Sequence, residues 1–303
     1  MIKKISMIGC GHVGATAAFQ ILNRTSPAKL ALIDTAGGRA AGIGLDLEDT
    51  RGILGFPTKI LAGTEAALAA ESDIVIVTAG LPRKQGMTRA DLYEKNKLII
   101  ESIVKPVAAA SPDAIFILVT NPLDLITRVA VRASGLPRTR VFGMGSSLDT
   151  SRMMNILSQK SGISAANIGG FVFGAHSKDM VVNPERIHIE GTPLPQLFPA
   201  QDLDELRTRV QQRGAEIVGH LKTGSAHFAP AAAISQLVEA IAADGHRIFP
   251  VSVLLNGEFG RHDVCMGAPC VISRQGIERI LEFELSEGEH TQLRTLMDAF
   301  REV

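Results

Sequence analysis

The chain has 303 residues, of which 46% are apolar, so it can form one large domain or two ordinary domains with full hydrophobic cores. Its 31 Lys and Arg side chains balance 31 Asp and Glu side chains. This balance argues against a nucleic acid or an anionic membrane as a partner, because either would need a concentrated basic face.

The sequence predicts neither a signal peptide nor a membrane-spanning segment, since the apolar start is short and runs directly into a glycine motif. We therefore expect a cytoplasmic protein. Cys10, Cys265 and Cys270 are too few and too scattered for a disulfide framework, and the last two are expected to be packed thiols. The histidines and cysteines have no metal-binding spacing, so we expect no metal.

Short β-rich apolar runs alternate with helical patterns through the first half. We expect strands at 4–8, 29–33, 59–61, 73–77, 114–119 and 140–143, and helices at 13–24, 38–52, 91–109, 123–134 and 146–160. This alternation predicts an α/β fold with a doubly wound parallel sheet. Beyond about residue 145 the pattern changes to strand-like runs at 170–173 and 180–182 and amphipathic stretches at 201–222, 231–243 and 276–302. We therefore predict two domains, residues 1–144 and residues 145–303, the second of the α+β class.

The first predicted strand ends in Gly9-Cys-Gly11-His-Val-Gly14, and a predicted helix follows. In such a motif the first glycine turns the chain, the second lets the backbone approach a pyrophosphate, and the third packs the helix on the sheet. Asp34 ends the next strand, where a carboxylate binds ribose hydroxyls and repels a 2′-phosphate. The first half is therefore predicted to be a Rossmann-type domain that prefers NAD to NADP. An aspartate that only caps a turn is the alternative, and the agreement of motif, spacing and strand argues against it.

Two later strands end in Thr78-Ala79-Gly80 and in Thr120-Asn-Pro-Leu-Asp124. Ligands of open α/β sheets bind outside the carboxyl ends of the strands, so both segments are expected beside the cofactor. Asn121 is expected to bond the cofactor ribose, the substrate oxygen or both. An asparagine that only forms the turn before a proline is the ordinary alternative.

Between these segments lies the loop Leu81-Pro-Arg-Lys-Gln-Gly-Met-Thr-Arg89, whose proline and glycine disfavour regular structure. A guanidinium matches a carboxylate through two parallel hydrogen bonds. Arg83 and Arg89 are therefore candidates to close over an acidic substrate and exclude water from it. Solvated loop arginines are the ordinary interpretation of this segment taken alone.

These motifs, followed by Ser147-Leu-Asp-Thr-Ser-Arg152 and Gly174-Ala-His176, occur in a recognisable order, which continues weakly into the segment 224–231. Over most of its length the chain resembles the lactate/malate dehydrogenase superfamily, in particular the malate dehydrogenases of the lactate dehydrogenase-like type. The resemblance implies a Rossmann domain followed by a catalytic domain, and NAD as the cofactor.

Oxidation of a secondary alcohol by NAD requires a base for the hydroxyl proton, and histidine suits this role near neutral pH. His176, which follows a strand-like run, is the candidate base. The resemblance implies Asp149 as the carboxylate that fixes its tautomer and stabilises the imidazolium. Arg152 lies three residues further on the same predicted helix and shares a face with Asp149. The alternatives are a surface ion pair for these two residues and a core or turn histidine for His176.

By the same resemblance, Arg152 would bind the substrate carboxylate next to the reacting carbon, and Arg89 would polarise the substrate carbonyl. Arg83 would set the choice of substrate: an arginine there implies a second carboxylate, hence malate and oxaloacetate, because a monocarboxylate leaves a buried guanidinium unpaired. The residues expected to contact the cofactor are Gly9, Gly11, His12, Val13, Gly14, Asp34, Thr78, Ala79, Gly80, Asn96, Val119 and Asn121.

Two positions depart from the family pattern. The family usually has Gly-Asp after the catalytic histidine, whereas this chain has Ser177-Lys-Asp179, and Lys178 would either lower the pKa of His176 or point away from it. His227 stands where an aromatic ring is more usual, and it would either touch the substrate pocket or pack within the fold.

The expected activity is reversible hydride transfer between (S)-malate or oxaloacetate and NAD. Another 2-hydroxyacid dehydrogenase, such as a lactate dehydrogenase, is the alternative within the superfamily, and a catalytically silent NAD-binding module is the alternative from another class. The helices at 38–52 and 146–160 have more apolar and small residues than one core needs. Together with the habit of the family, this predicts a homodimer or a homotetramer.

Overall fold

The computed structural model describes residues 2–82 and 87–301, apart from the side chains at 89, 295–299 and 301. Arg83 and the side chain of Arg89, both expected at the substrate, lie outside the described residues. None of the helices within the described ranges has the length and apolarity needed to cross a membrane.

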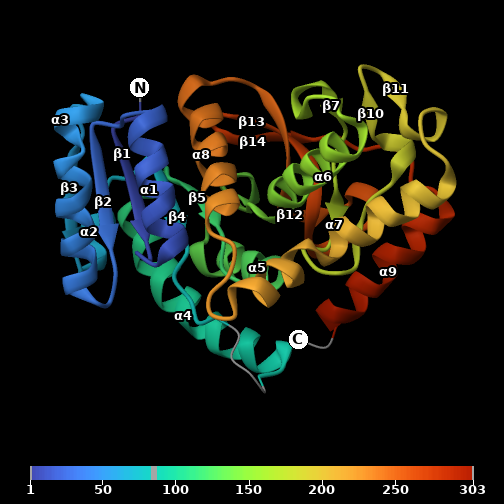
Figure 1. Cartoon of the computed structure of the whole chain (residues 1–303). Coiled ribbons are helices and arrows are strands. Elements are labelled where there is room, and N and C mark those ends of the chain that lie inside the picture. Colours follow the sequence, from blue (N-terminus) through green and yellow to red (C-terminus); the bar gives the residue numbers. More distant parts are fainter. Residues whose placement is uncertain (1, 83–86, 302–303) are drawn as a thin grey trace.

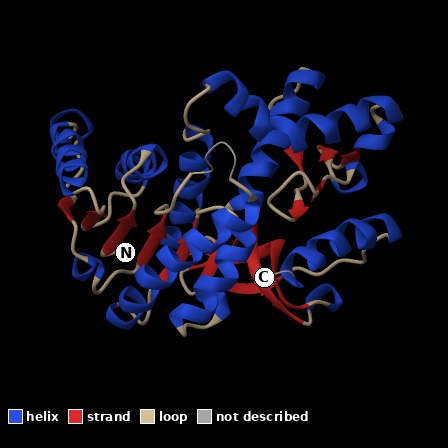
Figure 2. Ribbon diagram, turned by 90° about the horizontal axis from the view of Figure 1, so that it is seen from below, coloured by secondary structure: helices blue, strands red, loops and turns tan. Residues whose placement is uncertain are grey.

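One long sheet runs through the molecule, with helices on both of its faces (Figures 1 and 2). Its strand order is β3-β2-β1-β4-β5-β6-β12-β13-β8-β9, and β14 pairs with β13. The strands from β3 to β6 are parallel, which confirms the predicted Rossmann-type sheet. Their bounds are β1 Lys4–Ile8, β2 Lys29–Ile33, β3 Lys59–Gly63, β4 Ile74–Val77, β5 Ile115–Leu118 and β6 Val141–Gly143.

The central strands β4 and β5 contain no polar side chain, and every residue in them is buried. A strand that is apolar at every position cannot leave one face in water, so helices must cover both faces. Thr88 and Asp91 form a reciprocal capping box, which fixes where the helix after the 81–89 loop begins. The helices of this half are α1 His12–Arg24, α2 Gly37–Asp49, α3 Arg51–Leu54, α4 Arg89–Ala110 and α5 Leu123–Ser134.

The second half of the chain continues the same sheet with antiparallel strands. The pairing of Ser252 with Gly143 joins β12 to β6, and β13 pairs along the length of β12. The strands β7, β10 and β11 form a separate small sheet. The strands of this half are β7 Ile168–Gly169, β8 Phe173–Gly174, β9 Met180–Val181, β10 His188–Ile189, β11 Thr192–Pro193, β12 Arg247–Asn256, β13 His262–Ser273 and β14 Gly276–Ile280. Its helices are α6 Gly145–Ser161, α7 Ala200–Leu221, α8 Phe228–Ala243 and α9 Glu287–Arg301.

The prediction of an amphipathic helical stretch at 276–302 is wrong for its first residues. Gly276–Ile280 is strand β14, which forms a tight hairpin with β13, and α9 begins only at Glu287. The spacing of Ile277, Ile280 and Leu281 imitates one face of a helix. Pairing with the neighbouring strand outweighs this local pattern, because it satisfies the backbone and buries Ile277 against the core.

One hydrophobic core extends through both halves, and it includes all three cysteines as buried free thiols. This confirms the prediction for Cys265 and Cys270. A second cluster, which includes Met153, Val172 and Leu206, packs α6 against α7. The helix α6 is therefore held by packing on more than one side, which makes it a rigid support for the side chains that it presents.

Candidate active site

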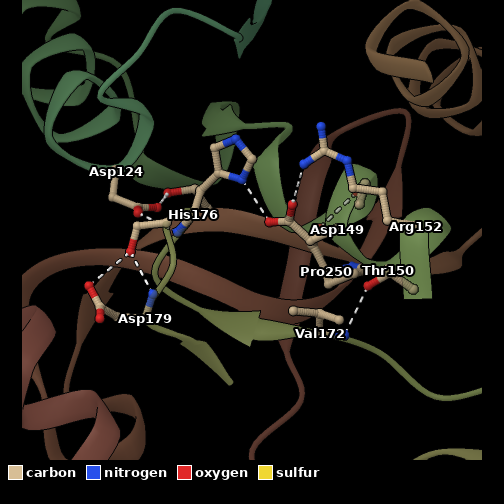
Figure 3. Close-up of polar contacts among 11 residues, drawn as sticks. Asp124, Asp149, Thr150, Arg152, Val172, His176, Asp179 and Pro250 are labelled. Atoms are coloured by element: carbon tan, nitrogen blue, oxygen red, sulfur yellow. Dashed lines mark hydrogen bonds and ion pairs between the residues drawn. The ribbon is translucent and has the colours of Figure 1, made fainter. Parts of the chain in front are cut away.

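His176 lies in the loop after β8, opposite Asp149 and Arg152 of α6 (Figure 3). The Nδ1 atom of His176 is 2.7 Å from Oδ2 of Asp149, and Nη1 of Arg152 donates to Oδ1 of the same carboxylate at 3.2 Å. Asp149 is fully buried, whereas the side chains of His176 and Arg152 keep 16% and 12% of their surface exposed. One buried carboxylate thus holds an imidazole and a guanidinium that a small molecule can still reach.

Buried neighbours fix the position of the His176 ring. Asp124, at the start of α5, accepts the backbone N–H of His176 at 2.8 Å and the hydroxyl of Ser252 at 2.7 Å. Gly145, at the start of α6, lies so close that a β-carbon there would be 2.7 Å from Cγ of His176. The second ring nitrogen, Nε2, points away from Asp149 (Figure 3). The ring is therefore oriented from three sides and presents one nitrogen for chemistry.

The surroundings of His176 raise its pKa above the ordinary value. Burial alone acts the other way, because it disfavours the charged imidazolium. The charge and the hydrogen bond of Asp149, with a further contribution from the charge of Asp124, outweigh both burial and the opposing charge of Arg152. The ring accepts a proton more readily than a solvent-exposed histidine, which suits a base that must take a proton from an alcohol.

The two departures from the family pattern occupy separate places. Lys178 is exposed, and the charges that act on His176 are those of Asp149, Asp124 and Arg152. The interpretation in which this lysine points away therefore fits the structure. The ring of His227 lies 5.4 Å from that of His12 between centroids, which places it beside the start of α1.

The glycine motif forms the turn from β1 into α1. Gly14 packs so tightly that a β-carbon there would lie 2.0 Å from the carbonyl oxygen of Gly9. Thr78 braces the turn by donating its hydroxyl to the same oxygen at 2.8 Å. At Gly11, no described residue other than its neighbours in the chain and helix has an atom within 4 Å of the position that a β-carbon would take, so the backbone at the helix start is open to a ligand. This arrangement fits a pyrophosphate bound at the amino end of α1.

A pocket of about 400 Å³ opens beside this turn, and the residues that line it include Gly9, Gly11, Asp34, Thr78, Ala79 and Gly80. Asp34 is held in place by two backbone N–H groups, that of Cys10 at 2.7 Å and that of Ala36 at 2.8 Å. Each carboxylate oxygen can accept a second hydrogen bond, so Asp34 remains able to bind ribose hydroxyls. The residues present therefore fit the adenosine half of a dinucleotide.

The two asparagines expected at the cofactor differ in their placement. Asn121 is exposed just beyond β5, at the carboxyl edge of the sheet, and Val119 lies two residues before it in the chain. Asn96 is fully buried in α4, where its side chain accepts the N–H of Leu81 at 2.7 Å and donates to the carbonyl oxygen of Asn121 at 2.7 Å. Asn96 thereby links the start of the 81–89 loop to Asn121, and its expected contact with the cofactor stays a prediction.

Comparison with known families agrees with both halves of this site. The family described as lactate/malate dehydrogenase, NAD binding domain, matches residues 3–143, and the family described as lactate/malate dehydrogenase, alpha/beta C-terminal domain, matches residues 146–303. The chain belongs to the lactate/malate dehydrogenase family. It is accordingly an NAD-dependent oxidoreductase, as expected from the glycine motif and Asp34.

The relatives of this dehydrogenase match it over nearly their whole length. A malate dehydrogenase from Staphylococcus saprophyticus is 40% identical over 303 residues, which are 99% of this chain and 97% of that one. The solved malate dehydrogenase from Salinibacter ruber is 33% identical, with a TM-score of 0.93 and coverage of 99% and 95%. A lactate dehydrogenase from Cryptosporidium parvum, solved with lactic acid and β-nicotinamide adenine dinucleotide, is 31% identical, with a TM-score of 0.94 and coverage of 99% and 96%.

The sequence did not predict a role for two residues of the dehydrogenase site, Asp124 and Arg39. Asp124 was included in the motif after β5 but received no role, although it is 1% exposed and holds the backbone of His176. An acidic residue between two leucines in the first turn of a helix was the available signal. Arg39, in α2, lines the cofactor pocket together with Asp34. No sequence signal separates it from an ordinary solvated arginine on a helix.

Proposed function

We propose that this chain is an NAD-dependent malate dehydrogenase, which transfers hydride reversibly between (S)-malate and NAD. The observation that carries the proposal is the buried carboxylate of Asp149, which binds His176 through one oxygen and Arg152 through the other. A surface ion pair, the alternative for Asp149 and Arg152, does not fit a carboxylate that is fully buried. Relatives named malate dehydrogenase, at about 40% identity over nearly the whole chain, support malate as the substrate.

The proposed mechanism divides the work among three residues. When NAD is bound, it supplies the hydride acceptor. Arg152 binds the substrate carboxylate next to the reacting carbon as a bidentate pair. His176 takes the hydroxyl proton at Nε2 as hydride leaves the same carbon, and in the reverse direction it returns that proton to oxaloacetate. Asp149 stabilises the imidazolium in between, and it keeps the proton of the neutral ring on Nδ1 so that Nε2 is free to accept.

Two further arginines are assigned to the substrate, and Arg83 is the one that selects it. Arg83 would bind the second carboxylate of a four-carbon diacid, and Arg89 would polarise the carbonyl as negative charge develops on it. A monocarboxylate such as pyruvate would leave the guanidinium of Arg83 without a partner, which favours oxaloacetate.

The test compares NADH consumption with oxaloacetate and with pyruvate. We expect the wild-type protein to turn over oxaloacetate at least about 10²-fold faster in kcat/KM, since a site built for an ionic partner strongly rejects an analogue that lacks it. Arg83→Gln should lose oxaloacetate activity selectively, whereas Lys84→Gln, which removes a neighbouring positive charge, should not. Equal rates with both substrates would contradict the malate assignment, and preference for pyruvate would make the chain a lactate dehydrogenase.

We also propose that the protein forms a homodimer or a homotetramer and lies in the cytoplasm. The proposed boundary between its two domains is at residue 144. Most apolar residues of α6 are buried within the chain itself, so this helix offers less free apolar surface than its sequence indicated. Leu45 of α2 and Ile53 of α3 remain 64% and 86% exposed, and they support the α2–α3 region as the contact between copies. Size-exclusion chromatography with light scattering tests this, since a monomer at micromolar concentration would contradict it.

A further inference from the structure

Arg39 lies in the first turn of α2 and lines the same pocket as Asp34. Its side chain is exposed and forms no hydrogen bond or ion pair with any residue in the described ranges. An exposed arginine without a partner in the chain is ordinarily solvated. This guanidinium instead lines a ligand pocket, and none of its five N–H donors is bound by a residue that the structure describes.

The charge of Asp34 does not act alone in this pocket. The described residues that line it include one carboxylate, Asp34, and one cation, Arg39, so the formal charges of the lining cancel. Both oxygens of Asp34 are also engaged by backbone N–H groups, which draw on its negative charge. Both charges act on the thiol of Cys10: its pKa is raised to about 12, first by burial and then by the charge of Asp34, while the charge of Arg39 acts to lower it.

A 2′-phosphate would enter this part of the pocket. Asp34 is placed to bind the ribose hydroxyls, and the phosphate of NADP replaces the hydrogen of one of them. A planar guanidinium binds phosphate oxygens through paired hydrogen bonds, and Thr35, which also lines the pocket, adds a hydroxyl donor. Asp34 therefore repels the 2′-phosphate, whereas Arg39 and Thr35 in the same site attract it.

We propose that Arg39 is a cofactor-specificity residue that admits a 2′-phosphorylated dinucleotide, so that the protein binds NADPH as well as NADH. Asp34 still favours NADH, and Arg39 reduces the difference in affinity between NADH and NADPH. The inference rests on the dinucleotide site of the proposed function and extends it to a second cofactor.

The experiment is a fluorescence titration of the full-length protein with NADH and with NADPH, without substrate, so that binding is measured apart from turnover. Arg39→Ala should raise the Kd for NADPH about tenfold, as expected for one charge-assisted phosphate contact, and change the Kd for NADH less than about twofold. Arg39→Lys, which keeps the charge but not the paired hydrogen bonds, should give a Kd for NADPH between those of the wild-type protein and Arg39→Ala. Lys59→Ala, which removes an exposed charge at the amino end of β3, should leave both Kd values unchanged. High salt should weaken the binding of NADPH to the wild-type protein. The affinity of Arg39→Ala for NADPH should stay nearly constant as the salt concentration rises.

Each remaining result counts against the inference. If the wild-type protein binds NADH but not NADPH, Asp34 alone sets the choice and the inference is wrong. If Arg39→Ala weakens both dinucleotides by the same factor, Arg39 serves the shared adenosine and not the phosphate. If the wild-type protein binds neither dinucleotide, the proposed function itself fails and the inference falls with it.

Discussion

Glu289 offers a quantitative test of how α9 is held against the molecule. This residue is 4% exposed, and its carboxylate accepts Nε of Arg186 at 2.8 Å, Nη2 of Arg186 at 3.0 Å and Nδ2 of Asn183 at 2.7 Å. Burial on its own would raise the pKa of Glu289, but these partners and the backbone N–H of Ser286 lower it to about 2. Since α9 packs against β9, which pairs with the strand before His176, this ion pair also supports the catalytic loop.

The magnitude follows from the shift in pKa. A fall from 4.5 to about 2 corresponds to about 3 kcal/mol of folding free energy at neutral pH, and breaking a buried pair costs a similar amount. Because the folded-state pKa is depressed, this stability is fully present above pH 4.5 and is lost as the pH falls toward 2. Glu289→Gln should therefore be less stable than wild type at pH 7, and the difference should shrink in acid.

The assay is urea unfolding followed by circular dichroism, at pH 7 and at a pH between 2 and 4.5. Glu287→Gln, an exposed carboxylate in the same helix turn, is the matched control and should unfold like wild type. The reasoning is refuted if Glu289→Gln unfolds at the same urea concentration as this control at pH 7. It is also refuted if the loss of stability is the same at both pH values.

Three further predictions concern the catalytic residues. Asp149→Asn should lower kcat by about 10³-fold while NADH still binds, because the imidazolium loses its charge partner; a kcat within tenfold of wild type would contradict this role. Gly145→Ala should lower kcat by about 10²-fold by displacing the His176 ring, and unchanged turnover would show that the ring has room to move. Because the pKa of His176 is raised, kcat/KM for malate oxidation should fall on the acid side of a midpoint above pH 6.5. The value of kcat/KM for oxaloacetate reduction should instead fall on the alkaline side. In Asp149→Asn both midpoints should move to lower pH.

The sheet and the cofactor turn could be predicted from the sequence because their signals are local. Runs that are apolar at every position, as in β4 and β5, indicate strands buried on both faces. The glycine motif and Asp34 combine a fixed spacing with a fixed place on neighbouring strands, and the structure puts Gly9, Gly11 and Asp34 around one pocket. The prediction failed at 276–280, where pairing with β13 outweighed a helix-like spacing.

The catalytic centre was harder to predict from the sequence, because its contacts join distant parts of the chain. The resemblance to a family supplied Asp149 as the partner of His176, and spacing alone would not have paired residues that lie 27 positions apart. Asp124 acts through a backbone N–H that lies 52 positions away, and such a contact leaves no pattern in a single sequence. Arg39 is visible as a candidate only once the fold brings the first turn of α2 to the pocket that Asp34 lines.

The junction between β6 and β12 has a consequence for how the chain can be divided. A fragment ending at residue 144 would leave β6 as an open edge, with backbone groups that Ser252 and its neighbours no longer cover. Asp124 would at the same time lose its bonds to Ser252 and His176, both of which come from the other half. Exposed edges of this kind recruit further strands, so the amino-terminal half made by itself should self-associate, and it is unsuited to serve as an isolated nucleotide-binding unit.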